Sequence, residues 1–411
     1  MRRNSELSEE EAAKAMSDCH FRCARRALNA FEKNGGIYIK IGQHLAALSY
    51  LIPIVCFLLD CVLMQEWVST MSILQDACPP TPMEAIERLY LKDVGHSLSE
   101  DFSYFNPIPL GVASLAQVHR ATLRASNRDV AVKIQHPEVA RYSVIDTNTT
   151  RFIFDTIERW FPEISIGWLG EEMEFSLPQE LDFERELRNA NLTKAHFEQI
   201  PGSCLKIPDM IWAKKRILVM ECIPFLCNVN IVIDGSRVDN LEYLSKHNIS
   251  PEKVSKALSE IFDEMTFISG HLHCDPHLGN VFIRPYSNPQ GFQIVLLDHG
   301  LYRMLPQELR TNYAQLWLSI INNDIPKMKY YSRIVANVPE EKFPLFASAI
   351  TGRNYGYVRK GDKVRVPRSI EEVEKIKTAN VGGEIMLELV DLLSNIPRIM
   401  LLLLKTNDLT R

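Results

Sequence analysis

The segment that decides the fold reads His-Cys-Asp-Pro-His-Leu-Gly-Asn, residues 273–280, and Asp298-His299-Gly300 follows it. Asp275 lies five residues before Asn280, and Asp298 lies eighteen residues after that asparagine. An aspartate so placed orients the hydroxyl that accepts a phosphoryl group, and the asparagine and later aspartate hold Mg²⁺ on nucleotide phosphates. Mg²⁺ prefers oxygen ligands and keeps several waters, so one carboxylate and one amide carbonyl are enough. The spacing therefore predicts a phosphotransfer site with Asn280 and Asp298 as metal ligands.

Two other interpretations of these motifs remain. Asp-Pro-His and Asp-His-Gly are also ordinary turn sequences, in which aspartate and glycine satisfy local backbone geometry. His273 and His277, four residues apart, would suit zinc on one face of a helix, but the glutamate of that zinc motif is missing. The order and the separation of the two motifs together favour phosphotransfer over both.

Several apolar runs predict strands around this site. Residues 280–283 and 293–297 are short apolar stretches beside the motifs, which places both acidic groups at strand ends. Residues 118–123 and 130–134 alternate on either side of a polar turn and predict a hairpin. Residues 216–222 predict a buried strand that ends in a polar residue.

The remaining chain is mainly helical in pattern. Residues 8–50 begin with Ser8 and Glu11 as a capping box, residues 138–198 are helical, and helices dominate from residue 250 onward. This order predicts an α+β, bilobal, protein-kinase-like fold that binds ATP or ADP between its lobes, with the hinge after Met220-Glu221. The predicted parts are a helical N-terminal extension over 1–80, a small lobe over 81–221 and a helical large lobe over 222–411.

Lys133 is the predicted phosphate-contacting lysine, in the run Val130-Ala131-Val132-Lys133. Strand alternation puts it on the face opposite Val130 and Val132, so a plain surface lysine is the alternative. Its predicted partner is Glu186, which helical spacing places on one face with Asp182. Lys133, Glu186 and Asp275 make up the predicted catalytic set.

The loop expected over the phosphates covers residues 110–119 and lacks the repeated glycines of ordinary kinases. Alanine does not adopt positive φ cheaply, so nucleotide placement should differ from that in a standard protein kinase. A plain strand-entry loop is the alternative. The predicted nucleotide-binding residues are Ala113, Ser114, Ala116, Gln117, Lys133, Met220 and Glu221.

Composition and cysteine content indicate which binding partners and which redox compartment to expect. The 411 residues are 46% hydrophobic and 24% charged, with a net charge of −5 and a pI near 6.2, which gives no support for nucleic acid as a partner. The nine cysteines form no C-x-x-C pair, and an odd total argues against a disulfide framework or structural zinc. We therefore expect free thiols in a reducing compartment.

No targeting segment is visible at the N-terminus, which is too acidic and polar for a secretory signal or a transit peptide. Residues 46–64 are mostly apolar and long enough to span a bilayer on paper, but they contain Pro53 and Asp60. We expect a buried or interfacial helix there rather than a membrane span.

The motifs together resemble those of the UbiB/aarF-domain family of atypical kinases. The resemblance covers about 260 residues, from Lys40 to Gly300. The segments that match are Lys40-Ile41-Gly42-Gln43, Ala116-Gln117-Val118-His119, Val132-Lys133, Glu180-Leu181-Asp182, residues 273–277 and Asp298-His299-Gly300.

The resemblance implies a regulatory lid over the substrate face. In that family a Lys-x-Gly-Gln motif pairs with the first acid of a Glu-x-Asp motif, which here implies Lys40, Gly42 and Gln43 with Glu180 and Asp182. Such a lid would exclude protein substrates, so the resemblance implies nucleotide-dependent lipid or quinone homeostasis at mitochondrial or plastid membranes. A lipid or membrane-associated small molecule is the implied partner, and protein partners stay unidentified.

This sequence departs from the family pattern in places. Residues 54–65 and 224–233 look like apolar insertions, and Leu278 stands where the family has proline, which should loosen the backbone of the catalytic loop. We also expect a C-terminal segment to be missing after Arg411.

Three functional interpretations follow from the sequence. The leading one is an atypical kinase-like ATPase with Mg-nucleotide between the lobes. The second is a catalytically silent pseudokinase scaffold that binds nucleotide and a lipid or membrane partner. A conventional serine/threonine kinase is the weakest, because the glycine-rich loop is missing and no Ala-Pro-Glu segment follows Asp298.

Overall fold

The computed structural model describes residues 9–47, 62–71, 73, 80–160, 167–223, 235–353, 355–359, 391–392 and 395–409. The chain divides into two compact units. Unit 1 comprises residues 1–78, 148–170 and 312–404, and unit 2 comprises residues 79–147, 171–311 and 405–411.

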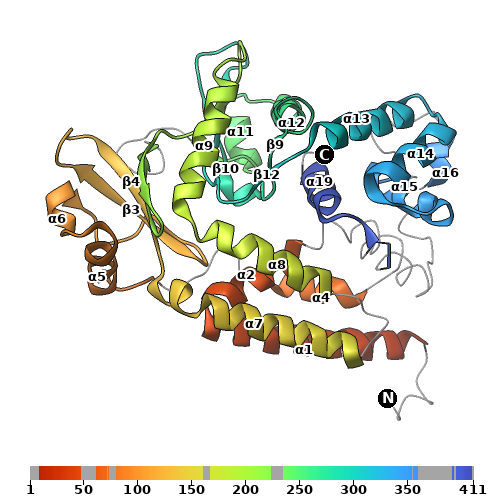
Figure 1. The fold of residues 1–411 in the computed structure, drawn as a ribbon, viewed down its shortest axis with the longest axis horizontal. Helices are drawn as coiled ribbons and strands as arrows, with labels where there is room; N and C mark the ends of the chain where they lie inside the picture. Colours follow the sequence, from red (N-terminus) through yellow and green to blue (C-terminus); the bar gives the residue numbers. More distant parts are fainter. Residues whose placement is uncertain are drawn as a thin grey trace. The chain divides into compact units, whose positions relative to one another are not determined.

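The larger sheet of unit 2 is antiparallel and has six strands (Figure 1). Its strand order is β1-β3-β4-β7-β6, and β2 pairs with β3 beside that path. The predicted hairpin is confirmed as β3 and β4, with Val118 opposite Lys133, and the predicted buried strand as β7. The strands are β1 (Phe102–Phe105), β2 (Gly111–Val112), β3 (Ala116–Leu123), β4 (Asp129–Gln135), β6 (Met210–Lys214) and β7 (Ile217–Glu221).

The alternation of β4 separates an apolar face from the face that bears Lys133. Val130, Val132 and Ile134 are fully buried and pack with Ile86, Leu89 and Tyr90 of α5 (Met83–Val94). Lys133 lies on the opposite face, where α9 (Phe183–Phe197) packs against β6 and β7. α6 (Leu98–Asp101) leads directly into β1. Strand periodicity thus turns Lys133 toward α9.

The remainder of unit 2 holds two smaller sheets and several helices. The four-stranded sheet has the order β5-β11-β10-β8, and β9 pairs with β12 as a two-stranded ribbon. The strands are β5 (Leu205–Lys206), β8 (Ser236–Arg237), β9 (His271–His273), β10 (Val281–Pro285), β11 (Phe292–Leu296) and β12 (Tyr302–Met304). The helices are α11 (Leu241–Lys246), α12 (Pro251–Asp263), the π-helix η3 (Glu264–Ser269) and the 3₁₀ turn η4 (Leu278–Asn280).

The described part of unit 1 is helical. α1 (Glu9–Asn34), α2 (Gly36–Ala47) and α4 (Val62–Met71) pack around Leu28, Ile39 and Met71. The later helices are α14 (Ile325–Ala336), α15 (Phe343–Thr351) and α16 (Tyr355–Arg359), with the short 3₁₀ turn η5 (Glu340–Lys342) before α15. Four helices run across the boundary between the units: α7 (Pro137–Trp160), α8 (Gly167–Glu180), α13 (Gln307–Ile321) and α19 (Arg398–Leu409).

The mixed α+β class and the helical N-terminal segment agree with the sequence predictions. The predicted cap at Ser8, the apolar insertion at 224–233 and most of the stretches 46–64 and 54–65 lie outside the described residues. Among the residues that are described, no helix is both long and apolar enough to cross a bilayer. Cys19, Cys23, Cys204 and Cys274 are free thiols, whereas Cys222 is disulfide-bonded, so the expectation of free thiols alone is wrong.

Candidate functional site

The centre of the candidate site is an ion pair between β4 and the first turn of α9. Lys133 Nζ donates to both oxygens of Glu186, at 2.7 Å to Oε1 and 2.9 Å to Oε2. The Glu186 side chain is 1% exposed and that of Lys133 is 16% exposed. The Lys133 ammonium also lies 5.0 Å from the centroid of the Phe183 ring. The predicted partner of Lys133 is therefore in contact with it, in a largely dry environment.

The charges of this pair are set by burial and by a third group. Burial alone would lower the pKa of Lys133, but the carboxylates of Asp298 and Glu186 outweigh it and raise that pKa. Burial raises the pKa of Glu186 against the opposing effect of the Lys133 ammonium. Lys133 thus keeps its charge, and its ammonium favours the ionised form of the Glu186 carboxylate against the effect of burial.

Asp298 is the third member of this cluster. Its Oδ2 lies 3.4 Å from Lys133 Nζ, and its Oδ1 accepts a hydrogen bond of 2.8 Å from the backbone amide of Gly300. Gly300 leaves little room at this point, because a Cβ there would lie 3.2 Å from Asp298 Oδ1 and 3.8 Å from Glu180 Cα. The first acid of the Glu-x-Asp motif therefore lies beside the glycine of the Asp-His-Gly motif.

The Glu-x-Asp motif has a structural role that helical spacing did not predict. α9 begins at Phe183, so Asp182 is its N-cap and accepts a bond of 3.2 Å from the Arg185 backbone amide. Asp182 and Glu186 do not converge on one helix face as predicted. One carboxylate caps the helix, and the other reaches Lys133.

His273 joins the two predicted acidic segments. Its Nε2 donates to the Asp298 carbonyl at 2.8 Å, and its Nδ1 accepts from the Asp275 backbone amide at 3.1 Å. Burial lowers the pKa of His273, so the ring is neutral and holds one proton, on Nε2. One imidazole therefore fixes the distance between the catalytic loop and the Asp-His-Gly turn, which excludes His273 as a zinc ligand through either nitrogen.

His299 occupies a similar internal position. Its Nε2 donates to the Leu296 carbonyl at 3.2 Å, and its Nδ1 accepts from the Tyr302 hydroxyl at 2.9 Å. Burial lowers the pKa of His299 to about 3. Asn189 of α9 donates to the His299 carbonyl at 3.0 Å. Asn189 and Tyr302, which sequence reasoning did not single out, therefore hold this turn against α9 and β12.

The side-chain amide of Asn280, a predicted metal ligand, contacts the catalytic-loop segment itself. Its Nδ2 contacts His277 Nε2 at 2.7 Å, which leaves the carbonyl oxygen as the group available to a cation. The Asp298 side chain is 40% exposed, unlike the buried Glu186. Within the described ranges, no three His, Cys, Asp or Glu side chains are grouped to hold a metal. Two oxygen ligands with water completing the shell fit Mg²⁺ better than zinc.

The alanine-rich loop uses many of its polar groups internally. The Ala113 amide donates to the Ala116 carbonyl at 2.8 Å, and the Ala113 carbonyl lies 2.9 Å from His136 Nε2. The Gln117 side chain is buried and contacts the backbone of Thr81 in both directions, at 2.6 and 3.2 Å. Ser114 and Ala116 are buried as well. Gln117, a predicted nucleotide residue, thus has its side-chain amide occupied within the small lobe.

The predicted hinge strand ends beside an apolar group of residues. Ala131, Met220 and Cys222 are buried together, and Leu110, Val118 and Met210 pack on them. Ala131 shares its strand face with Lys133, so the apolar group adjoins the ammonium. Glu221 turns elsewhere, because its Oε2 lies 2.7 Å from Lys206 Nζ and accepts from the Asp209 amide at 2.9 Å.

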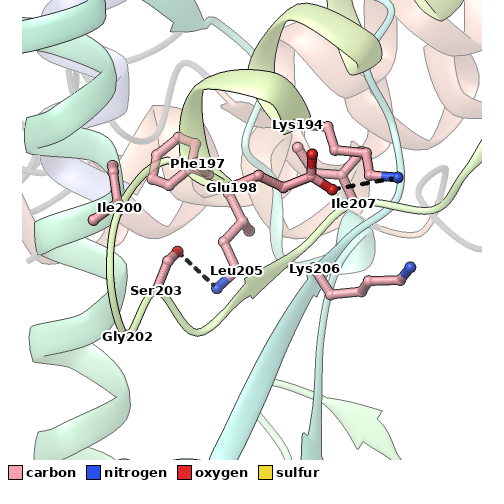
Figure 2. Close-up of a pocket in the computed structure, with 9 residues that line it drawn as sticks. All are labelled: Lys194, Phe197, Glu198, Ile200, Gly202, Ser203, Leu205, Lys206 and Ile207. Atoms are coloured by element: carbon pink, nitrogen blue, oxygen red, sulfur yellow. Dashed lines mark hydrogen bonds and ion pairs between the residues drawn. The ribbon is translucent and has the colours of Figure 1, made fainter.

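A pocket of about 260 Å³ lies behind that hinge (Figure 2). Asp209 pairs with Lys194, Lys206 and Arg128, which makes this neighbourhood an exposed ion network rather than a buried site. Figure 2 shows Lys194 turned toward Glu198, 3.6 Å away. The pocket lining is Lys194, Phe197, Glu198, Ile200, Gly202, Ser203, Leu205, Lys206 and Ile207.

The predicted lid residues fall in different units. Lys40, Gly42 and Gln43 lie on α2 of unit 1, and Glu180 and Asp182 lie in unit 2. The pairing of Lys40 with Glu180 therefore stays a prediction.

Lys405 is a site residue that the sequence analysis did not single out. It lies on α19, and its Nζ donates to Asp275 Oδ1 at 2.6 Å. The two side chains are 13% and 18% exposed. The available signal was a lone lysine directly after the apolar run 399–404, which is typical of a cation at the end of a buried helix face.

Comparison with known proteins defines the class first. The chain has the fold of the Rv3197 protein of Mycobacterium tuberculosis, solved in complex with erythromycin, with a TM-score of 0.51 and 16% identity over 96% of this chain and 97% of that one. Residues 73–332 match the model of the ABC1 atypical kinase-like domain. The bilobal kinase-like fold predicted from the motifs is confirmed.

Full-length relatives then define the family. The chain is 48% identical to the ABC1 family protein MCP2 homolog of Schizosaccharomyces pombe, over 99% of this chain and 70% of that protein. It is 41% identical to MCP2 of Saccharomyces cerevisiae, over 98% and 69%, and 38% identical to AarF domain-containing protein kinase 1 of Xenopus tropicalis, over 100% and 73%. The chain belongs to the ABC1 (UbiB/aarF-domain) family of atypical kinase-like proteins.

Proposed function

We propose that the protein binds Mg-ATP or Mg-ADP and is a phosphotransferase-type ATPase of the atypical kinase class. The observation that supports this most directly is the cluster of Lys133, the buried Glu186 and the partly exposed Asp298. An ammonium held by two carboxylates, one of them partly exposed, suits a site that takes a polyphosphate with its metal. Asp298 would keep the metal, and Lys133 would then turn its charge to the phosphates.

Each residue of the site has a task that its surroundings support. Mg²⁺, when bound, would neutralise phosphate charge between Asn280 and Asp298. Lys133, fixed by Glu186, would hold the α and β phosphates. The apolar group around Ala131 and Met220 would contact the base, and Asp275 would orient the acceptor hydroxyl or a water. Rate enhancement would then come from positioning and charge neutralisation.

The biological setting we propose is lipid or quinone homeostasis in mitochondria, with a lipid or membrane-associated small molecule as the partner. The support is the family to which the chain belongs and its Lys-x-Gly-Gln and Glu-x-Asp motifs.

The first experiment is thermal unfolding of the purified chain across ATP and ADP concentrations, with and without magnesium. A ligand at a hundred times its Kd adds about 2.7 kcal/mol to the free energy of unfolding. We expect nucleotide to raise the melting temperature, and to raise it further when magnesium is present. Lys133→Ala should remove the whole rise, and Asp298→Asn should remove only the additional rise due to magnesium. A rise that is unchanged in Asp298→Asn would contradict the metal assignment, and no rise in the folded wild type would contradict the proposal.

A second candidate is a pseudokinase scaffold without turnover. The internal hydrogen bonds of the alanine-rich loop favour it, because the Ala113 amide and the Gln117 side chain are already engaged. Turnover measured with and without anionic vesicles separates the two. Hydrolysis that depends on Asp275 supports the ATPase, and nucleotide binding with no hydrolysis under either condition supports the scaffold.

A further inference from the structure

The catalytic loop supplies no permanent cation of its own. Residues 271–280 contain three histidines, one aspartate and one asparagine but neither lysine nor arginine. The Asp275 carboxylate would face the terminal phosphate of a bound nucleotide, and two anions brought together in a partly buried site repel strongly. In addition to Mg²⁺ and Lys133, a positive charge placed directly at Asp275 would reduce this repulsion, and it has to come from another part of the chain.

Lys405 lies where that charge is needed. Its ammonium lies 2.6 Å from Asp275 Oδ1, and both side chains are mostly shielded from water. This is a direct, charge-assisted hydrogen bond rather than a long-range attraction. The interaction joins residues that are 130 positions apart in the chain.

α19 also contacts β9, the strand just before Asp275, through Thr406, the residue that follows Lys405. Thr406 is buried, and its hydroxyl donates to the His273 carbonyl at 3.5 Å. His273 is the residue that joins Asp275 to Asp298. The ammonium is therefore held by a helix that contacts β9 through Thr406, and its side chain is not a mobile one on the surface.

We infer that Lys405 is a positioning residue that neutralises Asp275, so that the site accepts a nucleotide triphosphate beside that carboxylate. This inference rests on the proposed function. It predicts discrimination between ligands: the γ-phosphate of ATP approaches Asp275, whereas ADP ends one phosphate earlier. Loss of the ammonium should therefore weaken ATP binding and leave ADP binding nearly unchanged.

The test is a double-variant comparison read by ligand affinity, which does not require turnover. Kd values for Mg-ATP and Mg-ADP are measured by calorimetry for wild type, Lys405→Met, Lys405→Arg, Asp275→Asn and Lys405→Met/Asp275→Asn. Lys405→Met should weaken ATP binding about tenfold relative to ADP, since an uncompensated like charge a few ångströms away acts on ATP alone. Lys405→Arg should restore the ratio, and Asp275→Asn should remove the effect of Lys405→Met.

A matched control tests helix docking separately from charge. Thr406→Val removes the contact to His273 and keeps the ammonium, so its ratio of ATP to ADP affinity should equal that of wild type. A ratio that falls equally in Thr406→Val and Lys405→Met would show that only docking matters and would overturn the inference. Tighter ATP binding in Lys405→Met would also overturn it, because the ion pair would then be an inhibitory latch.

The outcome for wild type separates the two proposals. If wild type binds ATP and ADP, and Lys405→Met has the same ratio of ATP to ADP affinity, the role of Lys405 is refuted and the proposed function stands. Wild type that binds neither nucleotide refutes the proposed function, and the role of Lys405 with it.

Discussion

Two groups of charged side chains in unit 2 make ion pairs of similar length in different surroundings. Around Lys133 the carboxylate of Glu186 is 1% exposed, whereas in the network behind the hinge Lys194 and Asp209 are 29% and 38% exposed. Exposed pairs contribute about 0–1 kcal/mol to stability, while breaking a buried pair from one side leaves a charge without solvent or partner. The same kind of ion pair is thus buried in one place and largely exposed to solvent in the other.

The energetic difference between the buried and the exposed ion pairs is tested most directly by removing one lysine from each group. Lys133→Met should lower the free energy of unfolding by about 3 kcal/mol, because the Glu186 carboxylate is left buried without its cation. Chemical denaturation measures this loss, and the magnesium-nucleotide rise in melting temperature should vanish with it. Equal losses in Lys133→Met and Lys194→Met would show that the difference in burial has no energetic meaning.

A paired substitution separates stability from binding in the buried group. Lys133→Met with Glu186→Leu removes both charges and fills the space with apolar atoms, so most of the lost stability should return. Nucleotide binding should not return, since the phosphate-contacting ammonium is still missing. Chemical denaturation measures the recovered stability, and calorimetry on the same preparation measures nucleotide binding. Recovered binding would contradict the assignment of Lys133 to the nucleotide site.

Acid should lower the free energy of unfolding through protonation of His271. Burial, with a smaller contribution from the charge of Arg185, lowers the pKa of His271 to about 4, against about 6.5 when the chain is unfolded. The unfolded state therefore binds the proton more tightly, so this contribution to stability is complete above pH 6.5 and is lost as the pH falls toward 4.

His271→Phe provides the matched measurement for that titration. The ring would keep its stacking on Tyr302, whose centroid lies 4.4 Å away, but would not titrate. Between pH 6.5 and 4, the slope of the unfolding free energy against pH should decrease. The decrease corresponds to up to one fewer proton taken up on unfolding. An unchanged slope would mean that His271 is not the group responsible.

The smallest effect is expected in the exposed network. Lys194→Met should change the free energy of unfolding by less than about 1 kcal/mol and should become undetectable in high salt. Nucleotide affinity should match that of wild type. A loss comparable with that of Lys133→Met would mean that the hinge network supports the site.

Local patterns predicted much of this arrangement. Alternation in β4 turned Lys133 away from Val130 and Val132, and the separations of Asp275, Asn280 and Asp298 placed them on neighbouring segments, because strands and tight turns have fixed periodicities. The pairing of Lys133 with Glu186 followed from the same motifs.

What local patterns missed depends on contacts that are distant along the chain. Helical spacing put Asp182 on the same face as Glu186, but α9 begins one residue later and the aspartate became its cap. The neutral state of His273 depends on burial and on two backbone partners. Lys405 could not be linked to Asp275 by spacing, because the two residues are 130 positions apart and meet only through the tertiary placement of α19.

The position of Lys405 has a consequence at the level of the transcript. The matched family domain ends at residue 332, well before α19. A splice variant or nonsense mutation that ended translation between residues 332 and 405 would retain the whole matched domain and its motifs. Such a product would lack the ammonium beside Asp275, so genetic variants in this last helix merit the same scrutiny as those in the motifs.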